Sequence, residues 1–182
     1  MLPKGCFSML KAKGHINISP GGALGLAALL LFVELRHLPA LLSAALIHEL
    51  GHITLLKLCG VKLIELKLEF FGLCLITTPP TSRAREALCA LSGPFAGLLW
   101  AAATHQHSPL TAAFSLLLSV YNLLPALPLD GGRALLALCG RRWILRLTGA
   151  ISACALLALA LWAPLPMLLL PAFWLWLEAI RA

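Results

Sequence analysis

Long apolar stretches alternate with short polar segments along this chain. A helix needs about 20 mostly apolar residues to cross the hydrocarbon core of a bilayer. Six apolar windows can be placed in the sequence, although the first and the last are short for a spanning helix. The windows cover residues 22–35, 39–58, 85–104, 110–129, 143–162 and 164–180. The pattern predicts an all-α polytopic membrane protein with about six transmembrane helices.

Two segments have the pattern of a β-strand instead. Residues 13–19 form a short stretch that favours β-structure, and apolar and charged residues alternate between Ile64 and Phe70. Phe71-Gly72 could turn the chain, and residues 73–77 could return as a second strand. We therefore expect a small β-hairpin directly after the second window. It would serve either as a connector or as an exposed edge to which an extended substrate adds as a strand.

The composition also indicates a membrane protein. The chain has 182 residues, of which 60% are hydrophobic and 12% are charged, and its mean hydropathy is +0.93. A soluble domain typically has about 45–50% apolar and about 25% charged residues. Because six windows leave little room for a large soluble module, we expect a single membrane-embedded domain over residues 1–182.

The basic residues indicate how the chain is oriented in the membrane. If the N-terminus lies in the cytoplasm, every Lys and Arg except Arg36 falls in a cytoplasmic segment. This distribution follows the positive-inside rule, so both termini and the β-hairpin are expected on the cytoplasmic side. Anionic lipid headgroups are sufficient to explain the formal net charge of +7, and no nucleic-acid partner is expected.

The second window contains the polar sequence His48-Glu49-Leu50-Gly51-His52. Residues four apart lie on one face of a helix, so both imidazoles could hold the same zinc ion at about 2.0–2.1 Å. Glu49 lies on the neighbouring side of the same turn, where it could take a proton from water. An isolated HExxH sequence is a weak signal, but this one interrupts an apolar stretch.

A catalytic zinc site usually has a third protein ligand, and Asp130 is the strongest candidate among the seven acidic residues. It follows Pro125 and Pro128 and precedes Gly131 and Gly132. Prolines cannot sit in an undisturbed helix, and we expect the glycines to free the backbone, so the helix should break beside this carboxylate. Such a break is tolerated in lipid where it lines a cavity or a metal. The alternative is that Asp130 merely caps a helix that starts at Gly131.

Three motifs together resemble the site-2 protease family of intramembrane zinc metalloproteases, and in particular its compact stage IV sporulation protein FB-like branch. The motifs are HELGH at 48–52, SGPFAG at 92–97 and NLLPALPLDGGR at 122–133. The resemblance covers roughly residues 14–140. Family members often carry a PDZ-like module or CBS repeats, and we expect neither in this chain. It also has Pro-Leu-Asp-Gly where some relatives have Asn-Pro-Asp-Gly, a change that keeps the acid and the glycine.

The resemblance implies that His48, His52 and Asp130 hold one zinc ion per chain and that Glu49 is the general base. Asn122 matches a family asparagine near the catalytic centre, where its amide would hold the water or the scissile carbonyl oxygen. The alternative role for Asn122 is a hydrogen bond between helices.

Gly93 and Gly97, in the third window, match a small-residue motif of the family. We interpret both as structural residues that let the third window pack closely against its neighbours.

The resemblance further implies a zinc metalloendopeptidase that cleaves membrane-associated proteins, such as a sigma or transcription factor precursor, with sporulation as one setting. The expected partners are this substrate, the lipid bilayer and regulatory membrane proteins, and the expected location is a bacterial cell membrane. Two other functions stay open. A catalytically inactive zinc-binding scaffold would have no use for Glu49 as a base. A metal transporter would need polar residues along the outer halves of the windows, where few are found.

Overall fold

The structure is a computed structural model, and the chain forms two compact units. One unit comprises Met1–Val33 with Val61–Pro79, and the other comprises Glu34–Gly60 with Pro80–Ala182. The described residues are 16–18, 20, 23, 33–61, 63–69, 72–78, 82–163 and 168–181. The first predicted window, residues 22–35, falls almost entirely outside them. The expectation of a single domain stays a prediction.

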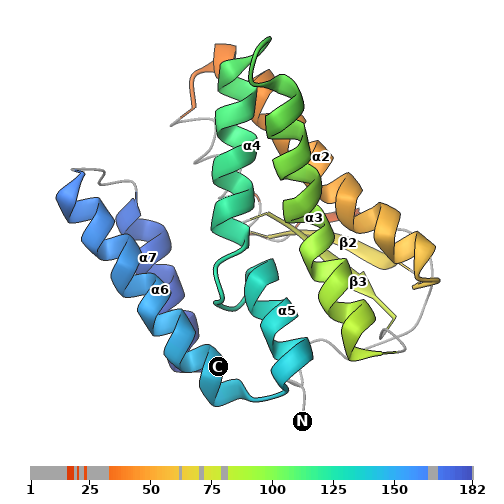
Figure 1. Cartoon of the computed structure of the whole chain (residues 1–182), viewed down its shortest axis with the longest axis vertical. Helices are drawn as coiled ribbons and strands as arrows, with labels where there is room; N and C mark the ends of the chain where they lie inside the picture. The colour runs from red at the N-terminus through yellow and green to blue at the C-terminus, as the bar shows by residue number, and fades with distance from the viewer. Residues whose placement is uncertain are drawn as a thin grey trace. The chain divides into compact units, whose positions relative to one another are not determined.

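The smaller unit contains a three-stranded sheet in the order β1-β2-β3 (Figure 1). The strands are β1 (Ile16–Ile18), β2 (Leu63–Glu69) and β3 (Gly72–Thr77). β2 and β3 pair antiparallel, which confirms the predicted hairpin. β1 pairs parallel with β2, with Ile16 opposite Leu66, a pairing that the sequence did not reveal. Within the described strands, the outer edges of the sheet therefore belong to β1 and β3.

The larger unit is helical, which confirms the predicted all-α membrane fold with a small additional sheet (Figure 1). A short 3-10 turn, η1 (Leu35–His37), precedes the first helix of this unit. The helices are α2 (Leu38–Leu58), α3 (Arg83–Thr104), α4 (Pro109–Asn122), α5 (Asp130–Cys139), α6 (Arg142–Trp162) and α7 (Leu169–Arg181). In the described part of the chain, α2, α3 and α6 are long and apolar enough to cross a membrane, and α4 and α7 are shorter apolar helices.

The fourth predicted window is not one continuous helix. α4 ends at Asn122 rather than at Leu129, an irregular segment covers residues 123–129, and α5 then begins at Asp130. The 14 residues of α4 extend over about 21 Å, less than the roughly 30 Å of the hydrocarbon core. Pro125 and Pro128 cannot donate helical hydrogen bonds, so the helix stops before them. The predicted break is confirmed, and the predicted end of the helix is corrected.

Small residues bring α2, α3 and α4 into close contact. A Cβ atom on Gly51 of α2 would lie 2.6 Å from the Ala96 Cβ and 2.6 Å from the Ser92 carbonyl oxygen of α3. A Cβ atom on Gly97 of α3 would overlap the Ser119 hydroxyl of α4. Small residues are typical of contacts between membrane helices, where close backbone approach increases van der Waals contact. This agrees with the structural interpretation of Gly97.

Helices α6 and α7 hold the irregular segment at residues 123–129 in place. Thr148 Oγ1 of α6 donates a 2.6 Å hydrogen bond to the carbonyl oxygen of Pro125. Ala126 and Leu129 are buried in an apolar cluster with residues of α6 and α7. The segment that leads into Asp130 is therefore fixed by contacts with helices that follow it in the sequence.

Candidate metal centre

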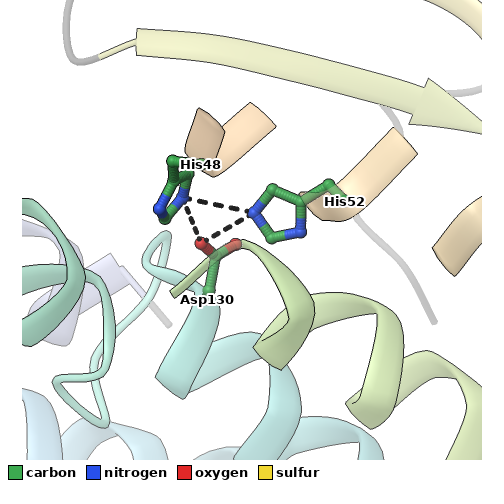
Figure 2. A group of neighbouring side chains, drawn as sticks. All are labelled: His48, His52 and Asp130. Atoms are coloured by element: carbon green, nitrogen blue, oxygen red, sulfur yellow. Dashed lines mark hydrogen bonds and ion pairs between the residues drawn. The ribbon is translucent and has the colours of Figure 1, made fainter. Parts of the chain in front are cut away.

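Three polar side chains from α2 and α5 meet inside the helical unit (Figure 2). His48 and His52 lie one turn apart on the buried face of α2, and Asp130 is the first residue of α5. The two Nε2 atoms are 3.3 Å apart, and Asp130 Oδ2 lies 3.2 Å from His48 Nε2 and 3.1 Å from His52 Nε2. All three residues are buried, with exposed fractions of 4%, 5% and 7%. These three residues are called the triad below.

The triad fits a tetrahedral metal ion. Ligand atoms at about 2.0–2.1 Å from a tetrahedral zinc ion are about 3.3 Å from one another, close to the three observed separations. Two imidazole nitrogens and a carboxylate oxygen are a donor set that zinc favours. Among the described residues, His48, His52 and Asp130 form a group of candidate ligands whose donor atoms lie within 4.8 Å of one another.

A backbone carbonyl of α3 orients His52. The Nδ1 atom of His52 lies 2.8 Å from the carbonyl oxygen of Cys89, which also accepts a 2.8 Å hydrogen bond from Ser92 Oγ. When His52 carries its proton on Nδ1 and donates it to this carbonyl, the lone pair of Nε2 faces the other two members of the triad. Metal-binding histidines are usually held in this way through their second nitrogen. Sequence reasoning missed this contact, because a backbone carbonyl leaves no residue-type signal.

Gly93 leaves the space that the imidazole of His52 occupies. A Cβ atom on Gly93 would overlap His52 Nε2 and would lie 2.6 Å from His52 Cε1. Gly93 therefore does more than the purely structural role that we inferred from the sequence. It borders the nitrogen atom that faces the candidate metal position.

We predict that Gly93→Ala weakens metal binding by displacing His52 Nε2. Zinc affinity, measured by competition with a chelator, should fall by at least about tenfold, as is common when the orientation of a ligand is disturbed. Gly149→Ala in α6 is the matched control, because the nearest neighbours of its new Cβ would be the Ala179 Cβ at 3.2 Å and the Ala126 Cβ at 3.7 Å rather than a member of the triad. Unchanged zinc affinity in a folded Gly93→Ala protein would show that this glycine does not shape the site.

Gly131 and Gly132 allow α5 to start directly against the irregular segment. A Cβ atom on Gly131 would lie 2.7 Å from the Leu124 carbonyl oxygen, and one on Gly132 would lie 2.7 Å from the Leu127 nitrogen. Both glycines are helical, and neither has a positive φ. The idea that they free the backbone is therefore corrected: they are needed for close approach of two backbone segments.

The side chain of Asp130 points to the imidazoles and does not cap its own helix. Leu129 is the N-cap residue of α5, so the capping alternative does not describe the structure. The Asp130 carboxylate instead places Oδ2 within 3.2 Å of both imidazole Nε2 atoms. Its second oxygen, Oδ1, lies 3.8 Å from Nη1 of the half-exposed Arg133.

Glu49 interacts with the triad, whereas the side chain of Asn122 is hydrogen-bonded within its own helix. The half-buried Glu49 carboxylate is close enough to His52, His48 and Asp130 to interact electrostatically with each of them. Asn122, at the end of α4, donates a 2.9 Å hydrogen bond from Nδ2 to the carbonyl oxygen of Leu118 in its own helix. The structure therefore shows a bond within α4 rather than the hydrogen bond between helices considered above.

The fold of this chain is similar to that of a known protein. No protein-family model matches the sequence. No curated protein matches it either. Among solved structures, the chain is similar to the site-2 protease from Methanocaldococcus jannaschii, with a TM-score of 0.69 and 22% sequence identity. The match covers 95% of this chain and 93% of that chain. The chain thus has the fold of a site-2 protease, and the resemblance inferred from the three motifs is confirmed at the level of the fold.

Proposed function

We propose that this protein is an intramembrane zinc metalloendopeptidase of the site-2 protease type. The observation that carries the proposal is the convergence of His48 Nε2, His52 Nε2 and Asp130 Oδ2 at separations of 3.1–3.3 Å within an apolar helical unit. Burying a carboxylate and two imidazoles at membrane depth is unfavourable unless these groups are paired or bind a metal ion. The site-2 protease fold is consistent with that purpose.

In this proposal, His48, His52 and Asp130 hold one zinc ion per chain. A zinc ion held there would act as a Lewis acid, which polarises a carbonyl oxygen and lowers the pKa of a bound water molecule. Glu49 is the general base. Its carboxylate takes a proton from the water molecule whose oxygen attacks the scissile carbonyl carbon. It then gives a proton to the departing nitrogen as the carbon–nitrogen bond breaks.

Asn122 would stabilise the negative charge that develops on the scissile carbonyl oxygen. One N–H of its side-chain amide donates to the Leu118 carbonyl oxygen, and a primary amide has a second N–H available for the substrate. A donor aimed at such an oxygen typically contributes about 10²–10³ to kcat. The bond to Leu118 would then hold the amide at the end of α4 in a defined orientation.

The substrate would be a membrane-associated protein that unwinds locally, because helical hydrogen bonds shield backbone carbonyl groups from attack. An outer strand of the sheet could receive the unwound segment through β-strand addition. We further propose a bacterial cell membrane location with both termini in the cytoplasm. A sigma or transcription factor precursor is the proposed substrate class, regulatory membrane proteins are the proposed partners, and spore formation is a proposed setting.

Metal removal tests the proposed function. The purified protein in detergent should contain one zinc ion per chain by elemental analysis. Cleavage of a co-purified membrane-tethered test substrate should stop when a chelator removes the metal, and zinc should restore it. Full cleavage by the metal-free protein would contradict the proposal.

A further inference from the structure

The second ring nitrogen of His48 lacks the partner that His52 has. His48 Nδ1 is buried and has no hydrogen-bond partner among the described residues, whereas His52 Nδ1 meets the Cys89 carbonyl. In Figure 2 this nitrogen points away from His52 and Asp130. Buried polar atoms are nearly always hydrogen-bonded, and metal-binding imidazoles usually use their second nitrogen for such a bond. A hydrogen-bonding group is therefore expected beside His48 Nδ1.

Two hydroxyl groups on α4 are also buried without a hydrogen-bond partner among the described residues. Ser115 and Ser119 are fully buried, with exposed fractions of 0%, and within the described residues neither Oγ has a hydrogen-bond partner. They lie one turn apart and so occupy one face of α4. Serine in a helix commonly bonds to the carbonyl four residues earlier, but neither hydroxyl does so here.

The contacts of α3 place Ser119 near the level of His48. Gly93 of α3 contacts His52, and Gly97, one turn further along α3, contacts Ser119. α2 and α3 lie side by side and run in opposite directions (Figure 1). One turn forward along α3 therefore corresponds to one turn back along α2, from His52 to His48. α4 also packs against α2, so Ser119 and His48 lie at the same level of a contact among three helices, called the helix junction below.

We infer that Ser119, together with Ser115, binds an internal water molecule that accepts the Nδ1–H of His48 at the junction of α2, α3 and α4. Internal waters typically make about three hydrogen bonds to buried polar groups that would otherwise be unsatisfied. Here the water accepts from His48 and donates to the two serine oxygens. Ser119 is then a positioning residue for the candidate metal centre. This inference rests on the proposed zinc site only for its effect on metal binding.

The water would decide which tautomer His48 adopts. With the proton on Nδ1, His48 donates to the water, and the lone pair of Nε2 is available to a metal. With the proton on Nε2, His48 would instead donate to Asp130 Oδ2, 3.2 Å away, and could not act as a ligand through that atom. Removal of the water-binding hydroxyl groups should therefore shift His48 towards the tautomer that does not bind zinc.

Ser119→Ala tests the inference in two measurements. In the metal-free protein, nitrogen-15 NMR of labelled histidine should show a smaller fraction of His48 protonated on Nδ1. Zinc affinity by chelator competition should fall about tenfold, with a larger loss in Ser115→Ala/Ser119→Ala. Ser152→Ala, which removes a buried hydroxyl from α6, is the matched control and should change neither quantity. A purely structural role for Ser119 would alter thermal stability without changing the tautomer.

Gly97→Ala provides a second variant that acts on the same hydroxyl from another helix. Its new Cβ would overlap Ser119 Oγ and displace it, so zinc affinity should fall as in Ser119→Ala. Because Ser119→Ala also removes the clash, the double variant Gly97→Ala/Ser119→Ala should bind zinc like Ser119→Ala alone.

An unchanged tautomer fraction of His48 in Ser119→Ala would overturn the inference whatever the zinc affinity, because the proposed water acts through the tautomer. If the wild-type protein bound no zinc, the proposed function would fail. The NMR measurement on the metal-free protein would still decide whether Ser119 orients His48.

Discussion

Glu49→Gln is expected to abolish substrate cleavage while the protein keeps its zinc. Glutamine has nearly the same shape as glutamate but cannot accept the proton from the attacking water. General base catalysis typically contributes about 10²–10⁴ to the rate, so cleavage should fall by at least this range. The metal should remain, because Glu49 is not part of the triad. The measurement is cleavage of a co-expressed membrane-tethered substrate, with zinc content determined on the same preparation.

The Glu49→Gln result separates the proposed protease from the other two functions. A zinc-binding scaffold or a metal transporter does not need a proton acceptor at this position, so either should be little affected. Glu86→Gln is the matched control, because it makes the same chemical change on the exposed first turn of α3. Cleavage by Glu49→Gln at the wild-type rate would rule out Glu49 as the base.

Asp130→Asn is expected to remove most of the bound zinc and, with it, the cleavage activity. Asn keeps the size of the side chain but lacks the negative charge that Asp130 places 3.1–3.2 Å from both imidazole Nε2 atoms. The loss in zinc affinity should exceed the roughly 10–100-fold that follows from changes to residues around the ligands. Zinc stoichiometry and chelator competition measure this effect directly.

Two further variants make the Asp130 test decisive. Asp130→Ala removes both side-chain oxygens at this position, so the variant should bind zinc no better than Asp130→Asn. Arg133→Gln removes the 3.8 Å ion pair with Asp130 Oδ1, but this guanidinium is half exposed, so only a small loss is expected. Wild-type zinc content in a folded Asp130→Ala protein would show that Asp130 is not a ligand and would leave α5 without a role in metal binding.

The long helices could be predicted because their signal is local. The predicted windows at 39–58, 85–104 and 143–162 match α2, α3 and α6 to within two residues at each end. Sustained apolar composition excludes most other structures at this length. The β2–β3 hairpin was predicted for the same reason, because a period of two residues is visible in a short stretch.

Features that depend on packing were predicted less well. The end of α4 at Asn122 and the separate helix α5 were not placed correctly, because residues 123–129 are as apolar as a spanning helix. Their irregular path is fixed by the Thr148 hydrogen bond and by the apolar cluster with α6 and α7. The parallel pairing of β1 with β2 was missed as well, since it joins segments that are distant in the sequence.

The sequence by itself determined that the chain builds membrane helices and that His48, Glu49, His52 and Asp130 are the residues with suitable chemistry for a zinc site. These conclusions need only residue types and their spacing along one helix or one turn. Only the tertiary structure brought Asp130 to the imidazoles, set the Cys89 carbonyl against His52 and buried two serine hydroxyl groups of α4 without a hydrogen-bond partner among the described residues. These features depend on how different helices pack, and a backbone carbonyl that orients a histidine has no signature in the sequence.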